Sequence, residues 1–158
     1  MRILTIGEAA AFAADERRQG HRLVFTNGVF DLLHPGHVRY LRAARAEGDA
    51  LMVGLNSDRS VRANKGPSRP ITTEHERAEL LAALACVDAV VIFDDETPEA
   101  LIRSVLPDIL VKGADWAADR IVGRDIVEGR GGRVMRMPVE QDWSTTALVR
   151  QARAAYLK

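Results

Sequence analysis

The sequence contains one cysteine, Cys86, among 158 residues. A single thiol excludes a disulfide within the chain and is typical of a protein kept in the reducing cytoplasm. Cys86 follows Leu84 and Ala85 in a helical pattern, so we expect a buried structural thiol. No apolar run reaches the length of about 18 residues that a membrane-spanning helix needs. The apolar start, residues 1–6, is too short for a signal peptide. The sequence therefore predicts a cytoplasmic protein without a membrane partner.

The sequence also lacks an excess of charge of either sign, since 22 basic residues balance 22 acidic ones. Nothing in this balance favours a nucleic acid as a partner. Lysine is scarce, with Lys65, Lys112 and Lys158 as the only examples in a chain rich in arginine. Lys65 and Lys112 are expected in loops, where a compact ammonium group can serve chemistry.

The chain alternates predicted strands with predicted helices, and its length fits one domain with its own core. Buried strands are expected over 22–25, 50–55, 88–93, 107–111 and 133–137. The helix expected over 6–19 is interpreted as an N-terminal extension, residues 1–20, that packs on the sheet edge or serves a dimer. Further helices are expected after His37, after Thr73 with a capping box to Glu76, after Thr97 as N-cap with Pro98 next, over 121–128 and from Trp143. This order predicts one parallel α/β sheet of about five strands, with helices on both faces.

A strand, a glycine-bearing loop and a helix start coincide in residues 25–37, Phe-Thr-Asn-Gly-Val-Phe-Asp-Leu-Leu-His-Pro-Gly-His. Gly28 can take a positive φ or let a ligand approach the backbone. Gly36 and His37 lie at the helix start, where free N–H groups favour an anion. His34 and His37 are three residues apart and share a helix face. The pattern favours a phosphate site over surface histidines, a mere turn, or a metal site that lacks a third ligand nearby.

Other polar groups follow the predicted strands and should gather at the carboxyl edge of the sheet, where ligands bind. They are Asn56, the Lys65 segment over 64–70, Lys112 to Trp116, and the three hydroxyls of residues 144–146. Arg77 falls in the first turn of a helix, against the dipole, and needs an anionic partner. Glu74, Glu76 or an anionic substrate could supply one.

Taken together, these motifs resemble the nucleotidylyltransferases that carry His-x-Gly-His. The resemblance is to heptose 1-phosphate adenylyltransferases, which make ADP-heptose alone or as the C-terminal half of a bifunctional kinase/adenylyltransferase. Gly-Leu-Asn-Ser-Asp, Lys-Gly-Pro-Ser-Arg-Pro, Glu-Arg-Ala-Glu-x-Leu, Val-Lys-Gly-x-Asp and Ser-Thr-Thr carry it further. A sugar kinase would need a much longer chain, so this chain resembles the stand-alone form. Val29 departs from the cysteine expected there, without affecting polar chemistry.

The resemblance implies a Rossmann-like doubly wound fold, a homodimer or higher homo-oligomer, and ATP with Mg²⁺ as the phosphate-bridging ion. The acceptor phosphate is already a nucleophile near pH 7, so alignment and charge stabilisation remain for the protein. His21 and His75 are expected at the surface. The implied catalytic residues are His34, His37 and Lys65. Nucleotide contacts are expected from Thr26, Asn27, Gly28, Phe30, Gly36, Ser144, Thr145 and Thr146. Contacts with the sugar phosphate are expected from Asp31, Asn56, Arg77, Lys112, Asp115 and Trp116.

Two alternatives remain open from the sequence. The first is a cytidylyltransferase for glycerol 3-phosphate or a similar alcohol phosphate on the same scaffold. The second is a nucleotide-sensing module that has lost its chemistry. The presence of His34, His37 and Lys65 argues against such a loss.

Overall fold

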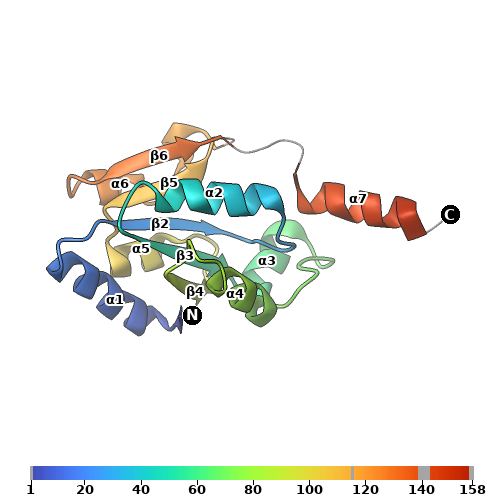
Figure 1. Ribbon diagram of the computed structural model, residues 1–158, viewed down its shortest axis with the longest axis horizontal. Helices are drawn as coiled ribbons and strands as arrows, with labels where there is room; N and C mark the ends of the chain where they lie inside the picture. Colours follow the sequence, from blue (N-terminus) through green and yellow to red (C-terminus); the bar gives the residue numbers. More distant parts are fainter. Residues whose placement is uncertain (1, 115, 139–142, 157–158) are drawn as a thin grey trace.

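Six parallel strands form one sheet in the part of the chain that the computed structural model describes, residues 2–114, 116–138 and 143–156 (Figure 1). The sheet order is β1-β4-β3-β2-β5-β6. The predicted α/β class is confirmed, with one strand more than expected. That strand, β1, pairs only Ile3 and Leu4 with Val90 and Val91 at the sheet edge. The bounds are Ile3–Leu4 for β1, Leu23–Gly28 for β2, Ala50–Asn56 for β3, Ala89–Phe93 for β4, Ile109–Gly113 for β5 and Arg133–Met137 for β6.

Helices cover both faces of this sheet, because alternate residues of its central strands face opposite sides. Phe25 packs into a core with residues of α1, α5 and α6, whereas its neighbour Val24 packs with residues of α2 and α4. The helices of the first face are α1 (Ile6–Arg18), α5 (Glu99–Val105) and α6 (Arg124–Glu128). Those of the second face are α2 (Pro35–Arg45) and α4 (Glu74–Ala82). The others are α3 (Asp58–Lys65), the 3₁₀ helix η1 (Ala118–Arg120) and α7 (Thr145–Tyr156).

The N-terminal helix α1 lies on a face of the sheet rather than at its edge. Ala9 and Ala13 are buried in the same core as Phe25, and α1 packs against α5 and β4. Two small side chains on one side of the helix allow this close approach. The helix is therefore part of the layer that covers the sheet.

The predicted start of α4 is confirmed, whereas α5 and α6 begin later than predicted. Thr73 caps α4 and forms the predicted capping box with Glu76. The expected cap at Thr97 is wrong, since α5 begins at Glu99 with Pro98 as its N-cap. The helix expected over 121–128 is shorter, because Gly123 adopts a φ of 87° and separates η1 from α6.

The order in which the chain adds strands to the sheet reverses direction between β2 and β5. After β2 the chain adds β3 and β4 on one side, then crosses to add β5 and β6 on the other. In such sheets ligands bind outside the carboxyl ends of the strands at this switch point. The starts of α2 and α7 lie at this same end of the sheet, and α7 extends away from the body (Figure 1). None of the described residues of α7 is buried.

Cys86 is half-buried against the core that α4 covers, and burial raises the pKa of its thiol. No helix among the described residues has the length and apolar character needed to cross a lipid bilayer.

Candidate active site

The loop between β2 and α2 is built as a strand, a tight bend and a helix start, as the motif predicts. Strand β2 runs three residues further than expected, so Thr26, Asn27 and Gly28 belong to it. The residue with positive φ is Phe30, at 48°, and Gly28 is not among the residues with positive φ. A Cβ on Gly28 would lie 3.0 Å from the Phe30 ring. Gly28 thus makes room for Phe30, which is a different reason from the one expected.

The two motif histidines lie against each other at the start of α2. Their rings stack with centroids 3.6 Å apart and an interplanar angle of 16°. His34 is the N-cap, and its Nδ1 accepts a hydrogen bond from the His37 amide at 3.3 Å. Since Nδ1 accepts, the neutral ring carries its proton on Nε2. The Phe30 ring meets His37 edge-on at 5.1 Å and holds it in place.

Burial favours the neutral form of both rings. It lowers the pKa of His34 below its ordinary value. The pKa of His37 falls from 6.5 to about 4, first because of burial and then because of the neighbouring His34, while the Leu32 carbonyl acts in the opposite direction. Among the described residues, no group completes a hydrogen bond to the buried Nδ1 of His37. An incoming phosphate would supply the negative charge that favours protonation of these rings.

The start of α7 packs directly on the start of α2. A Cβ on Gly36 would lie 3.0 Å from the Cβ of Trp143 and 3.2 Å from Nδ1 of His34, so only glycine fits there without displacement. The Trp143 ring is nearly parallel to that of His34, with centroids 6.2 Å apart. The Ser144 hydroxyl accepts from the Ala147 amide at 3.0 Å, as expected of a cap. Two helix starts therefore meet, and both present N–H groups suited to a polyphosphate.

Lys112 and Asn27 meet at the switch point between β5 and β2. Lys112 is 6% exposed and lies in β5, so its expected place in a loop is wrong. Its Nζ donates to Oδ1 of Asn27 and lies 5.4 Å from the centre of the Trp116 ring. Trp116 is half-exposed. These three residues form one side of the carboxyl edge, and Asp115, predicted beside them, lies outside the described residues.

Thr26 and Asp31 support the motif loop from within the protein. Thr26 is fully buried and its hydroxyl pairs with the Tyr40 hydroxyl at 2.8 Å, which leaves it no surface for the expected nucleotide contact. Asp31 is 5% exposed and accepts from Arg69 at 2.6 Å and from the Ile71 amide at 2.7 Å. Burial acts to raise the pKa of Asp31, but the bonds from Arg69, Thr72 and Ile71 outweigh it and hold that pKa below its usual value.

Arg77 is wholly buried, and its predicted contact with the acceptor has no exposed surface to support it. Its anionic partner is Asp58 at 2.7 Å, in place of the expected Glu74 or Glu76. It also donates to the carbonyl of Asn56 at 2.9 Å. The Asn56 amide donates to Ser60 at 3.0 Å, so this residue too is held by the protein.

Lys65 lies in the last turn of α3, not in a loop as expected. It is exposed, and among the described residues its Nζ forms no hydrogen bond or ion pair. Arg69, four residues after Lys65, pairs with Asp31. This ion pair fixes the far end of the segment that follows Lys65. Helix α3, whose last turn holds Lys65, lies at the same end of the sheet as the start of α2 (Figure 1).

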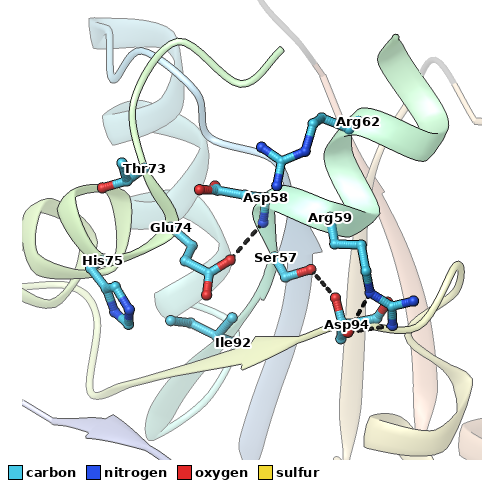
Figure 2. Close-up of a pocket in the computed structure, with 9 residues that line it drawn as sticks. All are labelled: Ser57, Asp58, Arg59, Arg62, Thr73, Glu74, His75, Ile92 and Asp94. Carbon is cyan, nitrogen blue, oxygen red and sulfur yellow. Dashed lines mark hydrogen bonds and ion pairs between the residues drawn. The ribbon is translucent and has the colours of Figure 1, made fainter. Parts of the chain in front are cut away.

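A separate open hollow of about 650 Å³ lies between α3 and the start of α4, beyond the ends of β3 and β4 (Figure 2). Two hydrogen bonds join residues that line this hollow. The Asp58 amide donates to Glu74, and the Ser57 hydroxyl donates to Asp94. Arg59 pairs with Asp94 at its rim. Neither motif histidine lines this hollow, so it is distinct from the predicted phosphate site.

No group of three histidine, cysteine or acidic side chains within the described ranges is placed to hold a metal ion. Sequence reasoning missed several supports that the structure reveals: Tyr40, Arg69, Thr72, Asp58 and Trp143. Trp143 had one local signal, since it directly precedes the Ser-Thr-Thr run.

A strand–loop–helix with paired histidines at a switch point is the arrangement of a nucleotidyltransferase site, and the family comparison agrees. The profile of the cytidylyltransferase-like family matches residues 25–151. The chain therefore belongs to the cytidylyltransferase-like family.

Its particular relatives are bifunctional proteins. The chain is 51% identical over 157 residues to bifunctional protein HldE of Geotalea uraniireducens, which covers 99% of this chain and 32% of that protein. It is 56% identical over 134 residues to HldE of Syntrophotalea carbinolica, covering 85% of this chain and 27% of that protein. The chain thus spans about a third or less of the length of these curated relatives. The predicted resemblance to one part of a bifunctional protein is confirmed.

Solved structures share this fold. The crystal structure of the lipopolysaccharide core biosynthesis protein from Thermoplasma volcanium aligns with a TM-score of 0.63 at 30% identity, over 77% of this chain and 98% of that one. A pantoate-beta-alanine ligase from Francisella tularensis aligns with a TM-score of 0.64 at 15% identity, over 100% of this chain and 78% of that one. The latter supports the fold alone.

Proposed function

We propose that this chain transfers AMP from ATP to D-glycero-D-manno-heptose 1-phosphate, giving ADP-heptose and pyrophosphate for lipopolysaccharide or another surface glycan. The observation that carries the proposal is the stacked pair His34 and His37 at the start of α2. It occurs in a chain that is about half identical, over nearly its whole length, to bifunctional protein HldE.

The acceptor phosphate attacks the α-phosphorus of ATP in line, and pyrophosphate leaves. An ionised phosphate monoester is itself the nucleophile, so no general base is required. The protein's part is to align the two phosphates and to stabilise charge as it develops on the transferred group. His34 and His37 donate to the phosphate oxygens of ATP, and the hydroxyls and amides of Ser144, Thr145 and Thr146 receive the β/γ end.

Lys65 reaches the α- and β-phosphates from the last turn of α3 when ATP binds. Its exposed position and lack of a partner within the described residues leave its ammonium available for this contact. Asp31 and Arg69 hold the following segment in place, so the movement required of Lys65 is confined to its own side chain and the turn around Gly66.

The acceptor lies at the β2/β5 switch point, beside Lys112 and Trp116. Lys112 offers an ammonium group that is already oriented by Asn27. The half-exposed Trp116 ring gives the sugar an apolar surface to pack against. Mg²⁺ would accompany ATP in this proposal and would neutralise part of the negative charge of its phosphates. The protein acts as a homodimer or higher homo-oligomer in the cytoplasm, as the resemblance implies.

The test is pyrophosphate release from ATP, CTP, GTP and UTP, each paired with heptose 1-phosphate, mannose 1-phosphate and glycerol 3-phosphate. We expect turnover to be fastest with ATP and heptose 1-phosphate. Acceptors without the sugar hydroxyls should be rejected by a factor of about 10⁴ in kcat/KM, because polar groups of the site would lose their partners. Light scattering on the purified protein tests the dimer.

A second candidate is transfer of CMP to glycerol 3-phosphate, and the family match favours it specifically because the family is described as cytidylyltransferase-like. Preferred turnover of CTP with glycerol 3-phosphate in the same panel would establish this alternative. Tight ATP binding without turnover of any pair would identify a nucleotide-sensing module.

A further inference from the structure

Arg77 is the most deeply buried charged side chain of the described core, and it makes more protein contacts than an ion pair requires. Its relative exposure is 0%. Its Nε donates to the Thr72 carbonyl at 3.1 Å, and its Nη2 donates to Asp58 at 2.7 Å. Its Nη1 donates to two carbonyls, that of Val29 at 2.6 Å and that of Asn56 at 2.9 Å. A single guanidinium thus joins three separate segments.

Each of these segments carries part of the candidate active site. Val29 directly precedes Phe30 and lies in the loop that leads to His34. Asn56 ends β3, and Asp58 begins α3, whose last turn holds Lys65. Thr72 is held from its other side by Asp31, since its amide donates to that carboxylate at 3.2 Å. The Arg77 contacts therefore set the separation between the loop that carries the histidines and the helix that carries Lys65.

Only arginine can make this set of contacts. Its planar fork offers five N–H donors in fixed directions, and four of them are used here. A lysine could keep the charge opposite Asp58, but its single ammonium cannot also reach the carbonyls of Val29, Asn56 and Thr72. The carbonyls of Val29 and Asn56 would then lose a buried donor, and the motif loop and the end of β3 would be free to move apart.

We propose that Arg77 is a positioning residue for nucleotidyl transfer, which fixes the motif loop against the end of β3 so that His34, His37 and Lys65 converge on one triphosphate. This inference rests on the proposed function for its kinetic test. Arg77 contacts neither substrate. It acts through the backbone of Val29 and Asn56.

Two variants separate positioning from simple support of the fold. Arg77→Lys keeps the charge and removes the carbonyl contacts, so we expect kcat to fall about 10–100-fold while the KM for ATP changes less than about threefold. Asp58→Asn weakens the ion pair and keeps the carbonyl contacts, so we expect a lower melting temperature with kcat within about threefold of wild type. The matched control is Arg103→Lys on α5, where the arginine pairs only with Glu99 in the described structure.

Loss of kcat in both variants in proportion to their loss of stability would overturn the proposal, and so would a wild-type kcat in Arg77→Lys. If Arg77→Lys does not fold, the double variant Arg77→Gln/Asp58→Asn takes its place in the experiment. It removes both charges of the ion pair together. This double variant should fold and show the same loss of kcat. A wild-type kcat in it would likewise overturn the proposal.

A readout that does not depend on turnover separates this inference from the proposed function. The ring NMR signals of His34 and His37 should shift in Arg77→Lys and stay unchanged in Arg103→Lys and Asp58→Asn. If wild-type protein releases no pyrophosphate with any substrate pair, the proposed function fails. The ring signals still test whether Arg77 positions the two histidines. Unchanged ring signals in Arg77→Lys would then show that Arg77 does not position the histidines.

Discussion

Replacing His37 should make the stability of the protein less sensitive to mild acid. The folded protein holds the pKa of His37 at about 4, whereas the ordinary value is 6.5. Between these two pH values the unfolded chain binds a proton that the folded protein excludes. The stability that depends on a neutral His37 is therefore complete above pH 6.5, and it is lost progressively as the pH falls toward 4.

The size of the effect follows from the same two values. A drop from 6.5 to about 4, at about 1.36 kcal/mol per pH unit, corresponds to at most about 3 kcal/mol. At pH 5 the pH is still above the folded-state pKa of about 4, so only part of this stability is lost. The linkage relation gives a loss of about 2 kcal/mol in unfolding free energy relative to pH 7.5. This is a sizeable part of the free energy of unfolding of a typical domain.

Urea unfolding at pH 7.5 and pH 5.0 measures this loss of unfolding free energy directly. The two proteins to compare are wild type and His37→Gln, because a glutamine side chain cannot gain a charge. Wild type should lose about 2 kcal/mol more than His37→Gln between the two pH values. The exposed His75 provides the control, since His75→Gln should behave as wild type. Equal losses in wild type and His37→Gln would refute the reasoning, because His37 would then titrate alike in both states.

Three further predictions concern the active site. His37→Ala should lower kcat by about 10²–10³, the effect of losing one charge-stabilising donor, and activity within about threefold of wild type would contradict the role assigned to it. Lys65→Ala should lower kcat more than it weakens ATP binding, whereas an unchanged kcat with a raised KM would show that Lys65 only binds. Gly36→Ala places a Cβ 3.0 Å from that of Trp143 and should raise the KM for ATP, measured beside Gly28→Ala, whose added Cβ would lie 3.0 Å from the Phe30 ring instead.

The parts of the site that the sequence predicted are those built from neighbouring residues. The His-x-Gly-His spacing places two rings on one turn, and the structure stacks them at 3.6 Å. The capping box of α4 is likewise contained in four residues, Thr73 to Glu76. The central strands carried long buried runs, and β3 is buried at every position. In each case one short stretch of sequence contains all the residues concerned: the two histidines, the two partners of the capping box, or the buried residues of the strand.

The parts that were missed depend on residues far apart in the chain. Strand β1 has two residues, too few for a periodic pattern, and it exists because β4 offers it an edge. Arg77 was expected to pair with an acid one to three residues away, but its partner is Asp58, 19 residues earlier. Lys112 was expected in a loop beyond a strand ending at Val111, yet pairing of Lys112 with Arg136 and of Gly113 with Met137 in β6 extends the strand through both residues.

These distant contacts explain how the residues proposed to bind phosphate can be few and simple. A helix start and two neutral imidazoles attract an anion only as well as their positions allow, because neither carries a full charge before the ligand arrives. The positions come from a buried shell that includes Asp31 and Arg77, whose partners all lie within the protein. In the proposed site, the sequence displays the groups that would touch the triphosphate, Lys65 among them. Asp31 and Arg77 look equally suited to bind a ligand, but their contacts within the protein hold those groups in place.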